Sequence, residues 1–350
     1  MVMALPRCHL KKISPDMSSW FVVVPPDGAA RMVGLEVVRA FDQCAIAYKA
    51  FKTGIFLREI RGHLRDPDDT LVVDLLNQSL AVSCLDFAPT HMLVLALAPV
   101  TLFTLKLLQR QRITTAHWFY EDYRRVPSWR TVLEGYDHFA AIQRGPLPSA
   151  CAAAASRYHF LHTAVMSPSL RAPDEPRTHD VAFVGVPSRH RVEVLEHLAE
   201  NGLRMLIAGH GWHRYAGPLR AHIVDDTWVS PERTASFLAR SRVGIDIPFH
   251  VPVARDPDTA VSPRVYNVLA AGAELVCEDV PQVHEVLDMC SFTTFTAPAG
   301  ARDAVRRALD AFDTRAAERE ANRRQVADHH TYARRVSRLV SRVETGDAAA

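Results

Sequence analysis

The sequence predicts two doubly wound α/β domains, because short apolar runs rich in β-branched residues alternate with amphipathic helices in both halves of the chain. A proline-rich, polar stretch over residues 145–179 separates the halves, and we place the domain boundary there. The length of 350 residues also favours two domains over one. We expect a first domain over residues 1–165, a second over 178–315 and a helical tail over 316–350.

The first half begins with WFVVVPP at residue 20, a short apolar run ended by prolines, and continues with RMVGLEVVRAF, which has helical periodicity. Similar apolar runs, which we interpret as strands, are TLVVDLL near residue 70, HMLVLAL at 91 and ITTAHWF at 113. The stretch LFTLKLLQRQ reads as a helix before the last of them. Continuous apolar strands between helices indicate a parallel sheet that is covered on both faces.

The second half repeats the alternation. Strands are expected at DVAFVGV, LRMLIAG, AHIVDD and VGIDIPF, and helices at RHRVEVLEHLAENG and SPERTASFLARS. In SPRVYNVLAAGAELVCEDVP (262–281), Ser262 is a favoured N-cap, Pro263 a favoured first helical residue and Gly272 a favoured stop. A helix from Pro263 to Ala271 should therefore precede a buried strand.

Charge and composition exclude several classes of partner. The chain has 41 basic and 39 acidic residues, a net charge of +2, which is too weak a field to indicate nucleic acid or an anionic membrane. The apolar stretch from Met92 is broken by Pro99 and is too short for an integral membrane segment. No export signal is recognisable at the N-terminus, so we expect a cytoplasmic protein with free thiols at its scattered cysteines, Cys8, Cys44, Cys84, Cys151, Cys277 and Cys290.

Two expected helix starts carry cations where the free amides and the helix dipole disfavour them by roughly 0.3–1 kcal/mol. Arg264 lies in the first turn after Ser262, and the turn after Ser188 holds Arg189, His190 and Arg191. A bound diphosphate would compensate for both, because ligands of open α/β sheets collect at the carboxyl ends of strands. Alternatively, these arginines are solvated or pair with local acids such as Glu193 and Asp258.

The face of the helix that carries Arg264 is expected to look into a cleft, while its apolar face packs on the sheet. The cleft face consists of Arg264, Asn267 and Ala271, and the sheet face of Val265, Val268 and Leu269.

Other polar residues follow strands. Glu121 and Asp122 come after an apolar strand and would orient an acceptor hydroxyl or act as a base, or form a helix N-terminal pair that suits the dipole. His210 and Gly211 belong to a glycine loop that either contacts a ligand or surrounds a core tryptophan. Glu278 and Asp279 would bond sugar hydroxyls or cap the next helix.

Several common motifs are missing from the sequence. There is no G-x-x-x-x-G-K-[ST], no G-x-G-x-x-G and no G-x-S-x-G, so a nucleoside triphosphatase, a dinucleotide oxidoreductase and a serine hydrolase are all disfavoured. His210 and His213 lack a matching pair of further ligands, and we expect neither a metal nor a resident cofactor.

Three segments resemble, in order and spacing, the second domain of CgeB-like glycosyltransferases, which have the GT-B fold. They are DVAFVGVPSRHRVEVLEHLAENGLRMLIAGHGW, SPRVYNVLAAGAELVCEDVPQVHEVL and HTYARRVSRLV. TTAHWFYEDYRRVPSWRTVLEGYDHFAAIQRG resembles a segment late in the first domain of those proteins, so the resemblance covers roughly residues 113–340.

The resemblance implies two Rossmann-like domains that face each other across a cleft, with a nucleotide sugar, UDP-linked or similar, held mainly by the second. It places Arg264 and Arg191 near the diphosphate and Asn267 near the ribose. Many retaining GT-B enzymes carry two glutamates eight positions apart, and this chain has Thr259 and Asn267 instead. The diphosphate would then be stabilised electrostatically by cations and helix N-termini, without a bound metal.

The sequence is therefore interpreted as a metal-independent glycosyltransferase with a glycan, a protein or a small molecule as acceptor. The alternatives are a non-catalytic nucleotide-sugar-binding or envelope-assembly protein on the same fold, and a nucleotide-sugar epimerase. The candidate catalytic residues are Arg264, Arg191, Glu121 and Asp122. The candidate substrate-binding residues are Gly185, Ser188, His210, Gly211, Ser262, Tyr266, Asn267, Glu278 and Asp279.

Overall fold

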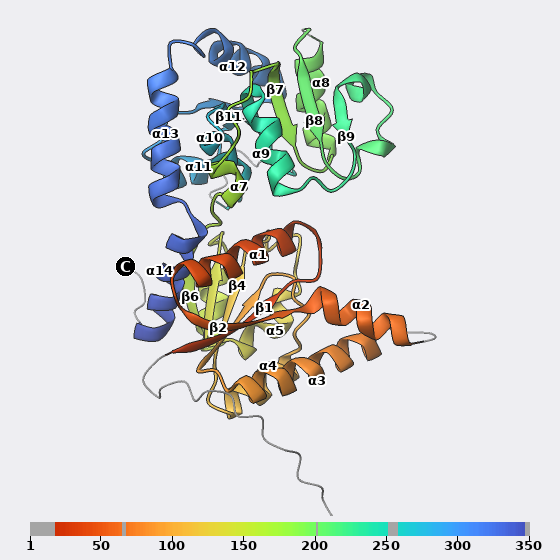
Figure 1. The fold of residues 1–350 in the computed structure, drawn as a ribbon, viewed down its shortest axis with the longest axis vertical. Coiled ribbons are helices and arrows are strands. Elements are labelled where there is room, and N and C mark those ends of the chain that lie inside the picture. Colours follow the sequence, from red (N-terminus) through yellow and green to blue (C-terminus); the bar gives the residue numbers. More distant parts are fainter. Residues whose placement is uncertain (1–17, 65–67, 201, 251–257, 347–350) are drawn as a thin grey trace, which may run out of the picture.

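The computed structural model describes residues 18–64, 68–200, 202–250 and 258–346. The N-terminal stretch considered for an export signal and Cys8 lie outside these residues. The five described cysteines are free thiols. Two sheets, each flanked by helices, lie one above the other along the long axis of the molecule (Figure 1).

The first domain is built on a parallel six-stranded sheet with the order β2-β1-β3-β4-β5-β6. The strands are β1 (Ser19–Val24), β2 (Ala47–Lys52), β3 (His91–Leu95), β4 (Thr114–Phe119), β5 (His138–Ala141) and β6 (Arg157–Phe160). The helices are α1 (Gly28–Gln43), α2 (Thr53–His63), α3 (Asp69–Phe87), α4 (Leu102–Arg110), α5 (Trp129–Val132) and α6 (Leu147–Ala153). All six residues of β1 are buried, as its run of apolar residues predicts for a sheet covered on both faces.

The second domain has a parallel six-stranded sheet with the order β12-β11-β10-β7-β8-β9. Its strands are β7 (His179–Val184), β8 (Met205–Ala208), β9 (Ile223–Asp225), β10 (Ser241–Asp246), β11 (Glu274–Glu278) and β12 (Thr293–Phe295). Its helices are α7 (Ser167–Leu170), α8 (Arg189–Ala199), α9 (Pro231–Ala239), α10 (Arg264–Ala270), α11 (Pro281–Val286), α12 (Pro298–Asp310) and α13 (Ala316–His329). Both halves of the chain are thus parallel α/β units, and the predicted fold class is confirmed.

One predicted strand is wrong. TLVVDLL near residue 70 lies in α3, because the Asp68 carboxylate caps the backbone amides of Thr70 and Leu71 at 2.6 and 3.1 Å. The apolar residues then continue at helical spacing, with Val72, Leu76, Leu80 and Cys84 buried. Seven apolar-rich residues alone do not distinguish a strand from part of a helix, and here the apolar pattern extends over a much longer segment.

Helix α3 also bears on the membrane question. Among the described residues it is the one helix long and apolar enough to cross a membrane, by length and composition alone, and 33% of that stretch is buried inside the protein. Core helices of proteins without membrane spans meet the same criterion, so the finding is weak evidence.

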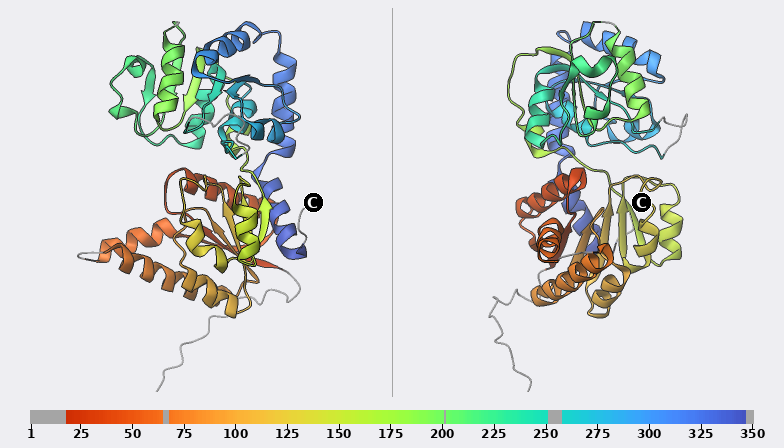
Figure 2. Two further views of the ribbon diagram at one scale, coloured as in Figure 1. Left: turned by 180° about the vertical axis from the view of Figure 1, so that it is seen from behind. Right: turned by 90° about the vertical axis from the view of Figure 1, so that its right-hand side faces the viewer.

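The C-terminal helices connect the two domains. Helix α13 packs on α10 of the second domain, and α14 (Tyr332–Thr345) returns to pack on α1 of the first, as Figures 1 and 2 show. Tyr332, Val336 and Leu339 of α14 are buried in the core of the first domain. The chain therefore crosses between the domains twice, and the crossings pair through the Val165 amide, which donates to the His330 carbonyl at 2.9 Å.

Side chains near the second crossing hold the domains together on one side. The Arg144 guanidinium forms an ion pair with Glu285 of α11 at 2.6 Å, and the Gln282 amide donates to the Ile142 carbonyl at 2.7 Å. The Asp258 carboxylate accepts the Gly145 backbone amide at 2.8 Å. The loop before α10 is thus anchored to the first domain.

Candidate functional site

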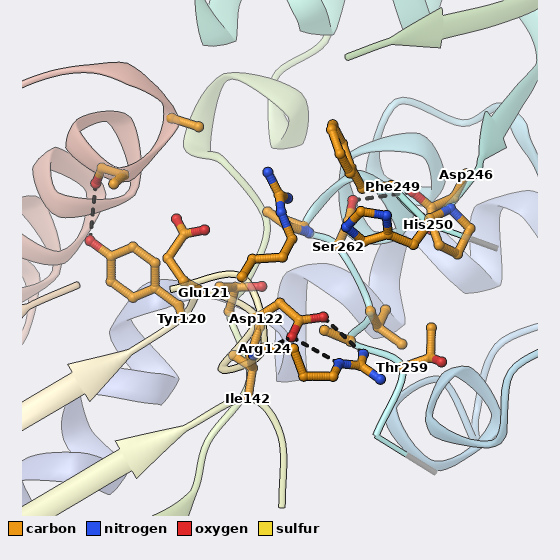
Figure 3. A pocket seen from close by; sticks show the side chains of 18 of the residues that line it. Tyr120, Glu121, Asp122, Arg124, Ile142, Asp246, Phe249, His250, Thr259 and Ser262 are labelled. Carbon is orange, nitrogen blue, oxygen red and sulfur yellow. Dashed lines mark hydrogen bonds and ion pairs between the residues drawn. The ribbon is translucent and has the colours of Figure 1, made fainter. Parts of the chain in front are cut away.

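A cavity of about 480 Å³ lies where the carboxyl ends of strands from both domains face each other (Figure 3). Residues that follow β4, among them Tyr120, Glu121 and Asp122, line it from the first domain. Arg191, Asp246 and Ser262 line it from the second. We call this the cleft cavity. Its position agrees with the rule that ligands of open α/β sheets bind at the carboxyl ends of the strands.

The strand order of the second sheet reverses between β7 and β10, and Arg264 spans this point. Its Nε donates to the Val184 carbonyl at the end of β7 at 2.7 Å, and its Nη1 pairs with the Asp246 carboxylate at the end of β10. The two side chains are only 11% and 9% exposed. The charge of Arg264 is therefore compensated by Asp246, and not by Glu193 or Asp258 as the sequence suggested.

The surroundings of Arg264 are built to fit that ion pair. The Ser262 hydroxyl accepts the Arg264 backbone amide at 3.0 Å and donates to Asp246 Oδ1 at 3.1 Å. A Cβ added at Gly185 would lie 2.6 Å from Arg264 Nη2, so glycine leaves room for the guanidinium. Gly185 and Ser262 thus support the arginine directly. The helix itself begins one residue later than predicted, with Pro263 as its N-cap.

Arg191 differs from Arg264 in its partners. Its Nε donates to the Ile247 carbonyl at 3.0 Å and its Nη1 to the Val186 carbonyl at 2.9 Å, and the residue is 7% exposed. Burial, with the nearby Arg264 cation, lowers the pKa of Arg191 to about 9. Its charge is met by carbonyl dipoles, and it lines the cleft cavity. An anion in the cavity would therefore stabilise Arg191 more than Arg264.

The two carboxylates after β4, Asp122 and Glu121, also differ in their partners and in the direction of their pKa shifts. Asp122 forms an ion pair with Arg124, with Oδ2 2.9 Å from Nη2 and Oδ1 3.1 Å from Nε. Burial would raise the pKa of Asp122, but the hydrogen bonds from Arg124 outweigh it and the pKa is lowered. Glu121 points into the cavity (Figure 3), and burial raises its pKa despite the nearby Arg125 cation. A carboxylate with a raised pKa at a cavity wall is suited to accept and release a proton.

His190, in the first turn of α8, forms a buried pair with Glu278 at the end of β11. The Ser188 hydroxyl accepts the Arg191 amide at 3.3 Å, as predicted for an N-cap. His190 Nε2 lies 2.7 Å from Glu278 Oε2, and both side chains are almost fully buried. The Glu278 carboxylate therefore already has His190 as its partner in the protein interior. Ser188 and His190 border a second cavity of about 570 Å³ together with Phe249 and His250.

The loop after β8 surrounds a core tryptophan, which is one of the two interpretations of its glycines. Trp212 is fully buried and its indole nitrogen donates to the Gly185 carbonyl at 2.8 Å, so the loop does surround a core tryptophan. Gly211 has a φ of +100°, a backbone conformation that residues other than glycine rarely adopt. His210 stacks on Trp228 with ring centres 5.6 Å apart, and Trp228 is 52% exposed. Neither ring lines the cleft cavity, but Trp228 lies beside Gly28 at the start of α1.

Of the nine predicted substrate-binding residues, all of which the structure describes, Ser262 lines the cleft cavity and the other eight do not. Tyr266 is fully buried and stacks on His330, with ring centres 5.0 Å apart. The Asn267 side-chain oxygen accepts the Met166 amide at 2.9 Å, which fixes the interdomain connection. Asp279 pairs with His284 at 2.6 Å on the surface. The helix face assigned to the cleft is covered because α7 and α13 pack against α10.

Residues that sequence reasoning missed include Asp246 and the aromatic residue Phe249. Phe249 lies between two cations, 4.0 Å from the Arg125 guanidinium carbon and 5.3 Å from that of Arg191, measured to the ring centre. Asp246 had a readable signal, since it is an acid at the carboxyl end of an apolar strand. No comparable signal marks Phe249. Within the described ranges, no group of three or more His, Cys, Asp or Glu side chains is placed to hold a metal ion.

The family described as glycosyl transferase-like matches this chain over residues 189–341. That span includes Arg191, Asp246 and Arg264 and ends in α14. No protein with a curated description matches the chain in sequence.

Several solved structures share the whole architecture. A sucrose-phosphate synthase from Thermosynechococcus elongatus has a TM-score of 0.64 at 10% identity, covering 94% of this chain and 100% of that one. HepE from Anabaena, solved with UDP and glucose, has a TM-score of 0.60 at 8% identity, with 94% and 100% covered. A putative UDP-N-acetylglucosamine 2-epimerase from Listeria monocytogenes has a TM-score of 0.57 at 9% identity, with 94% and 96% covered.

At these identities the likeness concerns the fold and not the activity. The relatives include a synthase and a putative epimerase, so the shared architecture does not by itself separate transfer from epimerisation. The chain has the GT-B fold, with two Rossmann-like domains facing each other across a cleft.

Proposed function

We propose that this protein is a glycosyltransferase that moves a sugar from a nucleotide-diphosphate donor to an acceptor hydroxyl. The observation that carries the proposal is Arg191, a buried cation that lines the cleft cavity and whose hydrogen-bond acceptors are backbone carbonyls. A buried charge without a carboxylate partner gains strongly from an anionic ligand. The match of a glycosyl transferase-like family to the segment that contains Arg191 supports the same conclusion.

The donor is proposed to place its diphosphate beside Arg191 and the N-terminus of α8, an eleven-residue helix. Arg264 would act one step away, by holding Asp246 and the end of β7 in place. The sequence predicted both arginines at the diphosphate, and the carboxylate partner of Arg264 favours Arg191 as the direct contact. A cation and helix amides can stabilise a leaving diphosphate, so the chemistry we propose does not require a metal. UDP in the related HepE structure supports a uridine diphosphate donor.

Across the cavity, Glu121 is proposed as the residue that takes the acceptor proton. In the reaction, the acceptor oxygen bonds to the anomeric carbon, the bond from that carbon to the diphosphate oxygen breaks, and the hydroxyl proton passes to Glu121. The raised pKa of this carboxyl keeps it a moderately strong base next to the reacting atoms. Asp122, which is held by Arg124, would orient the acceptor without exchanging a proton.

Nucleotide binding tests this proposal first. We expect UDP and at least one UDP-sugar to bind the wild-type chain in titration calorimetry. Arg191→Ala should weaken binding by about 10- to 100-fold, which corresponds to losing one charge-assisted hydrogen-bonded contact of about 1.5–3 kcal/mol. Arg220→Ala is the control, since Arg220 is an exposed arginine of the same domain that lines neither the cleft cavity nor the second cavity. Equal affinity of Arg191→Ala and wild type would contradict the assignment.

Product analysis then separates transfer from its alternatives. Release of UDP from a bound UDP-sugar, with the sugar appearing on an acceptor or on water, supports a transferase. Conversion of one UDP-sugar into its epimer would identify an epimerase. Tight binding without any turnover in the presence of cell-extract acceptors would indicate a nucleotide-sugar-binding protein.

A further inference from the structure

A third cavity, of about 550 Å³, lies on the other side of the domain crossing from the cleft. We call it the hinge cavity. Its walls come from both domains: Arg144 and the end of β6 from the first, α11 from the second, and α14, which joins them. It is lined by none of the residues that line the cleft cavity.

Adjacent residues of the crossing face the two cavities. Thr163 lines the cleft cavity and His162 lines the hinge cavity. The side chains of these two neighbouring residues therefore border different cavities. The Arg335 guanidinium also donates to the Thr163 carbonyl, at 3.2 Å. A ligand in the hinge cavity would therefore touch the segment that connects the domains.

The hinge cavity has more cations than anions. Arg335, Arg338 and Arg342 lie three and then four residues apart, on one face of α14, and Arg144 faces them from the first domain. The acids among the lining residues are Glu285 and Asp288, so four arginines meet two carboxylates.

These four arginines differ in their partners. Arg144 is paired with Glu285, while Arg335 and Arg342 donate to backbone carbonyls, the latter to Phe160 at 3.4 Å. Arg338 is exposed and has no hydrogen-bond or ion-pair partner within the described part of the chain. It is available to a ligand at the cavity mouth.

His162 supplies an independent indication of a ligand. The residue is 8% exposed, and neither Nδ1 nor Nε2 has a hydrogen-bond partner within the described part of the chain. Leaving a buried polar group unsatisfied costs about 1–3 kcal/mol. Burial, together with the cations Arg335 and Arg144, lowers the pKa of His162 to about 3, so the ring is neutral at pH 7 and carries one N–H donor. An acceptor oxygen in the cavity would satisfy that donor.

We propose that the hinge cavity is a binding site for a phosphate-type anion, held by Arg338, Arg342 and the neutral His162. Guanidinium groups bind phosphate oxygens with paired hydrogen bonds, and the tetrahedral group offers further oxygens to the imidazole. This site is separate from the cleft, and the inference does not depend on the proposed transferase activity. Inorganic phosphate and a phosphomonoester share the chemistry that the cavity recognises.

The test is calorimetric titration of the full chain with inorganic phosphate and, in a second arm, with glycerol 3-phosphate. We expect a dissociation constant in the millimolar range or below. The ligand that binds more tightly shows whether the site prefers the free ion or an ester. Arg338→Ala should weaken binding by about tenfold or more. Arg324→Ala, which removes an exposed arginine from α13 instead, should leave it unchanged.

The cleft supplies the second control, because Arg191 lies there and not in the hinge cavity. Arg191→Ala should bind phosphate as wild type does. The proposal is wrong if neither anion binds at millimolar concentration, if Arg338→Ala binds as tightly as wild type, or if Arg191→Ala abolishes the binding. His162→Phe, which fills the site without a donor, should weaken binding as well.

Discussion

The two cavities on either side of the domain crossing are both rich in arginine, yet their charges are arranged differently. Among the described residues, Arg124, Arg125 and Arg191 line the cleft cavity together with Glu121, Asp122 and Asp246, so the cations and acids described there are equal in number. In the hinge cavity, four arginines meet two acids. The number of arginines is therefore a poor guide to anion binding, and the partners of each arginine have to be considered.

Arg191 and Arg264 show the same difference within one site. The two residues lie at the starts of α10 and α8 and both reach the carboxyl edge of the second sheet. Within the described ranges, Arg264 has a carboxylate partner and Arg191 does not. Through its contacts with Val184 and Asp246, Arg264 joins the end of β7 to the end of β10. Under the proposed function, the carbonyl contacts leave Arg191 as a cation of the cleft that an incoming diphosphate would neutralise. Four experiments test these differences between the two cavities and between the two arginines.

The largest effect is expected from Asp246→Ala. It would leave the Arg264 guanidinium buried without a carboxylate, and breaking one partner of a buried pair costs about 3–5 kcal/mol. Urea unfolding of wild type and variant measures the loss. The double variant Asp246→Leu with Arg264→Met should recover much of that stability, because it removes both charges. A loss below about 1 kcal/mol for Asp246→Ala would mean that Arg264 is compensated by something else.

A smaller effect is expected on the rate of transfer when Glu121 is replaced by glutamine. Loss of a proton acceptor typically lowers kcat by about 100-fold or more, which is about 2.7 kcal/mol. Because burial raises the pKa of Glu121, the wild-type rate should fall on the acid side at a higher pH than an ordinary glutamate would give. The variant should lose that acidic limb. Asp122→Asn should keep the limb, since the Arg124 contact lowers the pKa of Asp122.

Because the pKa of His162 in the hinge cavity is lowered, we expect the stability of the fold to decrease in acid. Its pKa is about 3 in the folded protein and near 6.5 in the unfolded chain, so its contribution to stability is complete above pH 6.5 and is lost as the pH falls below it. Between pH 7 and pH 5, His162→Phe should therefore lose about 2 kcal/mol less stability than wild type. Denaturant unfolding at the two pH values checks this. His213→Gln, at an exposed histidine, should follow the wild-type curve.

The smallest effect on stability is expected for Glu285→Gln. Its ion pair with Arg144 is half exposed on both sides, and such pairs contribute about 0–1 kcal/mol. The same change removes one of the two acids of the hinge cavity, so phosphate should bind more tightly than to wild type. Paired thermal unfolding and phosphate titration give both quantities. Weaker phosphate binding in Glu285→Gln would contradict the charge argument.

Much of the fold was predictable from local patterns. Apolar runs such as WFVVVPP and HMLVLAL became β1 and β3, and the helix expected from Pro263 to Ala271 differs from α10 by one residue at each end. The prediction at TLVVDLL was wrong because these seven residues are part of a nineteen-residue helix, whose periodicity is visible only over the longer segment. The return of α14 to the first domain was not predictable, because its apolar stripe shows that the helix packs but not on which domain.

For the site, the sequence by itself brought Arg191, Arg264 and Glu121 to the carboxyl edges of their sheets, since strand–helix alternation determines which residues follow strands. What each of them contacts depends on the packing of residues far away in the sequence. Three contacts join residues that are far apart in the sequence. Arg264 and Asp246 are 18 positions apart, His190 and Glu278 are 88 apart, and Met166 and Asn267 are 101 apart. The hinge cavity likewise exists only because α14 returns to His162. Periodicity reports which face of an element is buried, but the partner across that face depends on the packing of distant elements.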